Sequence, residues 1–172
     1  MRDNLIKYEF KQIIKSTQLG TDLIGSENNS GIPLLKMGNL TVGGFSFKKL
    51  EKLKISEPEE VEKFVLYKGD FLFNTRNTLE LVGKSAVWNN ALSLATFNSN
   101  IMRIKFKQDL ADDFYLGYYF SMGDGWSKFK RITTGTTSVA AIYSKDLFKC
   151  IIKLPPLPQQ KKIAKILATV DT

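Results

Sequence analysis

The side chains that could perform chemistry in this 172-residue chain are limited by two absences. The chain has no histidine and a single cysteine, Cys150. Ser-His-Asp and Cys-His arrangements therefore cannot form, and one thiol without imidazole cannot complete a structural zinc site. Any hydrolytic activity would depend on carboxylates. We expect Cys150 to be a small core residue, in keeping with a reducing compartment.

Two short patterns resemble catalytic or cofactor motifs. Glu9-Phe10-Lys11 has a nuclease-like Glu-x-Lys spacing, which keeps a small magnesium-dependent nuclease as an alternative function, although no upstream Asp completes a metal site. Gly83-Lys84-Ser85 ends like a phosphate-binding loop, but that loop needs a glycine five positions earlier, where the chain has Thr78. No glycine-rich segment follows a buried strand to hold S-adenosylmethionine. These patterns favour binding over catalysis.

The composition favours an anionic partner. Lys and Arg number 25 against 17 Asp and Glu, which gives a formal net charge of +8. Such a charge attracts nucleic acid and strengthens its binding at modest salt concentrations. A protein-interaction module with incidental basic charge is the competing interpretation. No apolar run approaches the roughly 20 residues of a membrane span, so we expect a cytoplasmic protein without a membrane partner.

Arg76 and Asn77 have side chains suited to reading DNA bases. In the major groove, arginine can donate to N7 and O6 of guanine, and asparagine can pair with the N6 and N7 edge of adenine. Both residues follow the apolar run 71–73. A purely structural turn would use the same residue types, so both interpretations stay open.

A second set of residues has side chains suited to phosphate groups. Basic residues precede a polar loop over 133–138, whose hydroxyl and backbone N–H groups can donate to phosphate oxygens. Such contacts position a protein on DNA without specifying its sequence. The predicted contacts are Lys84, Lys128, Lys130, Arg131, Thr134, Thr136 and Thr137. A plain surface turn and an exposed strand lysine are the competing interpretations.

Many short strands and a few helices must position these residues, which indicates the α+β class. A hairpin is predicted to join 64–67 to 71–73 through a turn at 68–70. Further strands are predicted at 84–88, 94–97 and 101–106. In the last strand apolar residues alternate with basic ones, which predicts one basic sheet face. The alternating residues are Met102, Ile104 and Phe106 against Arg103 and Lys105.

Three helices are predicted before residue 154. A short helix over 50–63 would be capped by Ser56. Two aspartates suit the positive N-terminal end of a helix over 112–122, and Gly123 suits its exit. Another short helix is expected over 126–132.

The C-terminal segment joins prolines to an amphipathic helix. Pro155 and Pro156 cannot continue a strand ladder, whereas Pro158 suits the first helical turn. In the helix that begins there, apolar residues recur at i, i+3, i+4 and i+7 and form a stripe. The stripe consists of Ile163, Ile166, Leu167 and Val170. It could pack on the chain's own body or on a helix of another chain.

The segment 154–167 reads LPPLPQQKKIAKIL and resembles the conserved spacer of the specificity subunits of type I restriction-modification systems. In that family a PPLPxQxxIAxIL pattern follows a DNA target-recognition domain. Further motifs of such a domain occur here in the same order over nearly the whole chain. They are Leu19-Gly20, Pro33–Leu40, Gly69–Arg76, Val82–Ala86 and Gly135–Thr137.

The resemblance implies a target-recognition domain over 1–154, then a proline-rich junction and the start of a spacer and dimerisation helix over 155–172. It implies a non-catalytic subunit that binds double-stranded DNA and binds no cofactor or metal itself. Methyltransferase subunits would bring S-adenosylmethionine, and a motor-nuclease (restriction) subunit would bring ATP and Mg²⁺. Family members usually carry two recognition domains and two long helices. A homodimer would restore the second reader and predicts an interrupted palindromic target.

Overall fold

The structure is a computed structural model that describes residues 4–55 and 58–170. Short strands and short helices share the chain, which confirms the predicted α+β class. The helices are α1 (Phe10–Ile13), the 3-10 helix η1 (Pro58–Phe64), α2 (Asp113–Ser121), α3 (Gly123–Arg131), α4 (Ser144–Leu147) and α5 (Leu157–Ala168). The strands are β1 (Ile6–Glu9), β2 (Ile14–Leu19), β3 (Ile32–Leu35), β4 (Glu51–Leu53), β5 (Phe71–Asn74), β6 (Arg76–Asn77), β7 (Ser85–Val87), β8 (Thr96–Phe97), β9 (Ile101–Phe106), β10 (Thr134–Gly135), β11 (Ala140–Ala141) and β12 (Ile151–Leu154).

The described strands form four small sheets, in the orders β1-β12, β4-β3-β8, β2-β9-β5-β7 and β10-β11-β6. The sheet β2-β9-β5-β7 is antiparallel throughout and forms the centre of the molecule. One of its faces packs on α2 and α3, where Phe71 contacts both Phe106 and Phe120 in one aromatic core. Its other face contributes Leu72 to a second core around Trp88. All of β5 is buried because both faces and both edges are covered.

The predicted strands over 84–88, 94–97 and 101–106 are confirmed as β7, β8 and β9. The predicted hairpin is wrong, because β5 pairs with β7 and β9 and not with 64–67. Within that segment, the Leu66 N–H donates to the Ala95 carbonyl at 2.9 Å. Long-range pairing therefore displaced the local hairpin.

The helix predicted over 50–63 is only partly present. Its first residues instead form β4, which pairs with β3, and η1 covers 58–64. The expected cap, Ser56, lies outside the described residues. Pairing with β3 buries Leu53, which a solvent-facing helix would have left exposed.

The predicted basic face of β9 is partly offset by one buried carboxylate. Asp70 is fully buried and pairs with both Arg103, at 3.2 Å, and Lys105. Arg103 also donates to the carbonyls of Lys63 and Val65, each at 2.7 Å. The side chain of Arg103 is 11% exposed, so this cation is a structural group.

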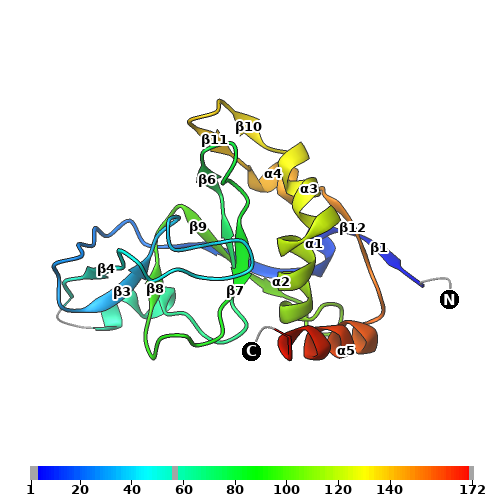
Figure 1. The fold of residues 1–172 in the computed structure, drawn as a ribbon, viewed down its shortest axis with the longest axis horizontal. Helices are drawn as coiled ribbons and strands as arrows, with labels where there is room; N and C mark the ends of the chain where they lie inside the picture. Colours follow the sequence, from blue (N-terminus) through cyan, green and yellow to red (C-terminus); the bar gives the residue numbers. More distant parts are fainter. Residues whose placement is uncertain (1–3, 56–57, 171–172) are drawn as a thin grey trace.

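The two predicted helices before the Thr-rich loop are confirmed with shifted bounds. The Asp112 carboxylate accepts a hydrogen bond from the Tyr115 N–H at 2.9 Å and caps α2. Helix α3 begins at Gly123, three residues earlier than expected, and follows α2 almost directly. A Cβ at Gly125 would lie 2.0 Å from the Tyr119 carbonyl oxygen, so this tight connection needs a glycine. Figure 1 shows both helices beside the central sheet.

Helix α5 begins at Leu157 with Pro158 in its first turn, close to the predicted start. Gln160 is 1% exposed and fastens the helix to the body. Its side chain accepts from the Asp112 N–H at 3.0 Å and donates to the carbonyls of Leu110 and Pro155, at 3.1 and 2.8 Å. Figure 1 shows α5 at the opposite end of the molecule from β6, β10 and β11. Within the described residues, no helix has the length and apolar character needed to cross a membrane.

Candidate nucleic-acid interface

The sheet β10-β11-β6 joins two predicted site segments that are far apart in the sequence. Ala141 of β11 is paired with Thr134 on one side and with Arg76 on the other. Directly opposed residues of antiparallel strands point to the same face. Arg76 and Thr134 therefore flank a small alanine on one face, and both are exposed. This face presents the Arg76 guanidinium group to solvent, and the Thr134 hydroxyl donates to the Ala141 carbonyl at 3.3 Å.

Asn77 lies on the other face of the same sheet. It is paired with Ala140, which is buried in the main core. The Asn77 side-chain oxygen accepts a hydrogen bond from the Thr78 N–H at 2.8 Å. The structure thus separates Asn77 from Arg76, because neighbouring strand residues alternate between faces. Base reading by Asn77 stays a prediction, and its observed contact is local.

The predicted polar loop is the turn of a hairpin. Gly135 has a φ of +125° and would place a Cβ 2.3 Å from the Val139 carbonyl oxygen, so the turn requires glycine. The Thr136 hydroxyl accepts from the Val139 N–H at 3.2 Å and organises the turn. The Thr137 carbonyl accepts from the Leu79 N–H at 3.0 Å, which ties the hairpin to the segment after β6. Thr134, Thr136 and Thr137 are all exposed.

Lys130 is held by the segment after β6. Its ammonium group donates to the carbonyls of Leu79 at 2.8 Å, Glu80, and Val82 at 3.4 Å, and it lies 4.6 Å from the centre of the Trp126 ring. Burial lowers the pKa of Lys130 from its ordinary value. A lysine has three N–H donors, and the three carbonyls can engage all of them. A phosphate contact by Lys130 stays a prediction.

The remaining basic candidates differ in exposure and in neighbours. Arg131 is exposed in the last turn of α3, whereas Lys84 and Lys128 are half-buried. Burial has the largest effect on the pKa of Lys130 and lowers it. The charge of Glu80 raises this pKa, and the charge of the nearby Lys84 lowers it. These two lysines therefore form one basic cluster beside the 79–82 turn.

Lys128 lies on another side of α3. Burial raises the pKa of the Cys150 thiol, and the charge of Lys128 opposes that rise. Residues two positions apart on a helix do not face the same way. The structure therefore does not bring Lys128 together with Lys130. Cys150 itself is buried, as predicted.

A cleft of about 350 Å³ lies beside Arg76 and was not predicted from the sequence. Segments from four parts of the chain surround it, and two of them, at Leu19 and at Arg76, belong to motifs that carried the family resemblance. Its polar side chains besides Arg76 include Asp22, Ser99, Asn100, Tyr143 and Ser144. Only tertiary contacts bring these residues together, so the sequence held no signal for them.

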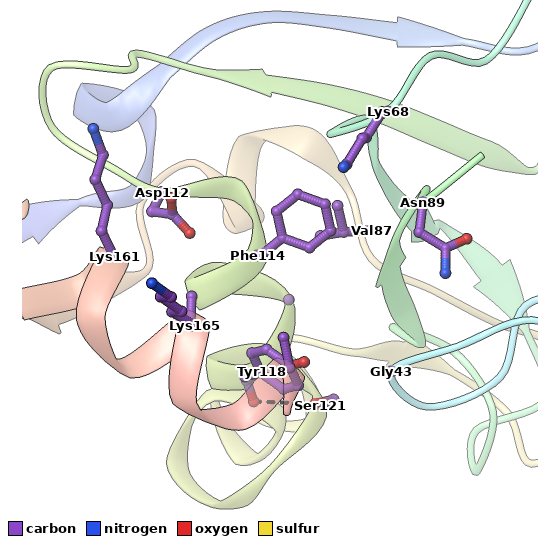
Figure 2. Close-up of a pocket in the computed structure, with 13 residues that line it drawn as sticks. Gly43, Lys68, Val87, Asn89, Asp112, Phe114, Tyr118, Ser121, Lys161 and Lys165 are labelled. Carbon is purple, nitrogen blue, oxygen red and sulfur yellow. Dashed lines mark hydrogen bonds between the residues drawn. The ribbon is translucent and has the colours of Figure 1, made fainter. Parts of the chain in front are cut away.

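A larger pocket of about 580 Å³ lies at the junction of α2 and α5. Figure 2 shows Phe114 and Tyr118 on α2, with Lys161 and Lys165 on α5 and Lys68 across the pocket. The pocket therefore has aromatic rings along its wall and lysines around it. It lies at the α5 end of the molecule, away from the β10-β11-β6 sheet (Figure 1).

The apolar stripe of α5 is only partly covered. The helix buries Gln160 and Ala164 against the body, and this face is rotated away from the stripe. Ile163 and Leu167 are half-buried at its edge. Ile166 remains 55% exposed, and Val170, which was predicted to lie on the helix, lies beyond its end at Ala168 and is 76% exposed. Contact of the stripe with another chain stays a prediction.

The two catalytic-looking patterns have ordinary structural surroundings. Glu9 and Lys11 form a surface ion pair of 3.0 Å, in which both side chains are exposed. Within the described residues, no group of three or more carboxylate or cysteine side chains could hold a metal ion. Gly83 has a φ of +84° and leads into strand β7, whereas a phosphate-binding loop leads into a helix. Neither pattern supports an enzyme.

Comparison with protein families decides the affiliation of this chain. The model of the type I restriction modification DNA specificity domain matches residues 8–172. The chain belongs to this family. The type I specificity family was the one expected from the C-terminal spacer pattern and the ordered internal motifs.

Individual relatives agree with this family. The MjaX specificity subunit of Methanocaldococcus jannaschii is 26% identical over 95% of this chain and 38% of its own length. The EcoKI specificity subunit of Escherichia coli K12 is 25% identical over 96% of this chain and 37% of its own length. The fold resembles the type I S subunit structure from M. genitalium, with a TM-score of 0.64, 14% identity, and coverage of 99% of this chain and 40% of that one. The chain thus spans less than half the length of these relatives.

Proposed function

We propose that this type I specificity domain binds a short, specific sequence in double-stranded DNA and directs a restriction-modification complex to it. The observation that most supports the proposal is the outward face of the β10-β11-β6 sheet. There Arg76 is exposed, and within the described residues its guanidinium has no hydrogen-bond or ion-pair partner. The formal charge of +8 and the family membership support the same partner.

In this proposal the chain contributes recognition, and its partners contribute chemistry. Methyltransferase subunits carry S-adenosylmethionine, and restriction subunits carry ATP and Mg²⁺. The chain binds none of these cofactors. The α5 end is the docking end, because α5 exposes Ile166 and lies on the far side of the molecule from β6, the strand of Arg76 (Figure 1).

We also propose that two copies of the chain assemble through α5. The exposed Ile166 of α5 offers an apolar surface that the same helix of a second copy can cover. A twofold dimer presents identical readers to two half-sites, so its target is an interrupted palindrome. The helix alone is marginal for a coiled coil at this length, and the methyltransferase subunits complete the assembly.

The test is to co-express the chain with a type I methyltransferase subunit from the same organism and to map adenine methylation across the host DNA. The expected result is methylation at one interrupted palindrome that disappears when the chain is omitted. Absence of any chain-dependent motif would refute sequence-specific recognition. An asymmetric motif would keep recognition and reject the homodimer.

A further inference from the structure

The cleft beside Arg76 is built from segments that backbone hydrogen bonds lock together. The Thr21 N–H donates to the Phe97 carbonyl at 2.9 Å, and the Ser99 N–H donates to the Thr21 carbonyl at 3.0 Å. The Thr75 N–H donates to the Asn100 carbonyl at 3.0 Å. These bonds hold the segment of Asp22 and the strand of Arg76 against the same turn before β9. The cleft is therefore a preformed feature of the fold.

The Ile142 N–H adds a third connection by donating to the Thr75 carbonyl at 3.0 Å. It fixes the segment after β11, which brings Tyr143 to the cleft. Tyr143 is 51% exposed although it is a large aromatic residue. An exposed aromatic side chain beside polar groups is common at binding surfaces.

Asp22 and Arg76 line this cleft together and are both exposed. In the part of the chain that the structure describes, neither side chain has a hydrogen-bond or ion-pair partner. The cleft thus offers the Asp22 carboxylate as an acceptor and the Arg76 guanidinium as a donor. Neither charged group takes part in a contact that stabilises the described fold. A purely structural pair would be joined to each other or to neighbouring backbone groups.

The charge of Asp22 decides what kind of DNA group fits here. A carboxylate repels a phosphate, so this cleft is unsuited to the DNA backbone. The major-groove edge of a G·C pair is complementary to the Asp22 and Arg76 side chains of the cleft. Guanine offers the acceptors N7 and O6, and cytosine offers its N4 amino group as a donor. An arginine can donate to guanine N7 and O6, and an aspartate can accept from the cytosine amino group.

We infer that the cleft reads one G·C base pair, with Arg76 donating to guanine and Asp22 accepting from the cytosine amino group. This inference rests on the proposed function and names two residues that determine its specificity. Arg76 was predicted to contact DNA, whereas Asp22 gains its role only through its tertiary position. Both residues act on the same base pair.

The test is selection from a random duplex library by the chain assembled with its methyltransferase subunit. Asp22→Ala and Arg76→Ala are each expected to lower discrimination about tenfold at one and the same G·C position, with the other positions unchanged. Asp109→Ala, an exposed carboxylate beyond the other end of β9, is the matched control and should keep the wild-type motif. Far-UV circular dichroism and melting curves confirm that each variant is folded.

Four outcomes overturn the inference. If the two variants lose base discrimination at two different positions, the two residues do not read the same base pair. If Arg76→Ala weakens binding equally at all positions, Arg76 contacts phosphate and not a base. A wild-type motif that survives both substitutions unchanged would refute the cleft as a reader while leaving the proposed function intact. If the wild-type complex selects no motif at all, the proposed function fails and the inference fails with it.

Discussion

At the scale of single residues, Asp70 shows how this domain holds charge inside its core. Its carboxylate is fully buried between Arg103 and Lys105, and it also accepts from the Tyr67 N–H at 3.0 Å. A buried charge is tolerated only when it is paired and hydrogen-bonded. The Gly69-Asp70 pair was part of the family resemblance, and its aspartate serves the fold.

We predict that Asp70→Asn destabilises the protein by about 3 kcal/mol, because it leaves the buried Arg103 without its counter-charge. Urea unfolding at neutral pH measures this loss. Glu51→Gln is the control, since it breaks the more exposed pair with Lys36 at 2.7 Å and should cost less than about 1 kcal/mol. Equal effects of the two substitutions would contradict the buried ion pair.

Asp113 gives the domain a defined pH dependence. The pKa of its carboxyl group is raised from 3.8 to about 6, and burial is the largest cause. Hydrogen bonds from Gln108 lower this pKa, and repulsion from Asp112 raises it. Because this pKa is higher in the folded state, the carboxyl group adds its full contribution to the unfolding free energy below about pH 3.8. This contribution is lost as the pH rises through about 6. The cause is that the folded protein binds a proton more tightly than the unfolded chain.

We predict that Asp113→Asn flattens the fall in unfolding free energy between about pH 4 and pH 6. Denaturant unfolding at several pH values measures the slope in wild type and variant. Asp109→Asn, at an exposed position nearby, is the control and should retain the wild-type slope. An unchanged slope in Asp113→Asn would show that this carboxyl is not the titrating group.

At the scale of elements, the Leu19-Gly20 pair has a packing role. A Cβ at Gly20 would lie 2.1 Å from the Phe97 carbonyl oxygen and 2.5 Å from that of Asn98. The end of β2 can therefore approach the segment after β8 only without a side chain. This contact supports the wall of the cleft that contains Asp22.

We predict that Gly20→Ala destabilises the domain by about 2 kcal/mol, because backbone atoms must shift to admit the methyl group. Gly38→Ala is the matched control, since a Cβ there has nothing within 4 Å. Thermal unfolding of both variants measures the difference. Equal melting temperatures would argue against close packing at Gly20.

The attachment of α5 depends on a glutamine in the spacer pattern. Gln160 makes three hydrogen bonds with backbone groups, whereas the adjacent Gln159 is exposed. We predict that Gln160→Leu costs about 2 kcal/mol or more, because it leaves buried N–H and carbonyl groups unpaired. Gln159→Leu should cost little. Hydrogen exchange of α5 amides measures whether the helix detaches, and equal protection in both variants would refute this role.

At the scale of the whole molecule, the exposed side of α5 and the β10-β11-β6 sheet lie at opposite ends (Figure 1). The surface proposed for assembly and the surface proposed for DNA reading are therefore separate. We predict that Ile166→Glu leaves the unfolding free energy within about 0.5 kcal/mol, because this side chain is 55% exposed. The same variant should lose assembly with a second copy and with the methyltransferase subunit.

Sedimentation velocity of the co-expressed complex measures that loss. Ser127→Glu, an exposed position on α3, is the control and should assemble normally. Normal assembly of Ile166→Glu would reject α5 as the docking helix. Loss of stability in the same variant would show that the stripe serves the chain's own fold.

Local patterns in the sequence determined the class of the fold and several of its elements. The capped start of α2, the proline start of α5 and the alternation in β9 are visible within a few residues, because caps and periodicity act over short distances. The ordered motifs also identified the family. The division of the chain at residue 154 stays a prediction.

Only the tertiary structure decided which of these residues share a surface. Strand pairing placed Arg76 on the exposed face of its sheet and Asn77 opposite Ala140 on the other face, and it placed the buried Asp70 against Arg103 and Lys105 of β9. The same long-range contacts placed Asp22 in the cleft beside Arg76. Such pairings join residues that are distant in the chain, and their free energy depends on the whole core. These long-range pairings therefore cannot be predicted from a short stretch of sequence.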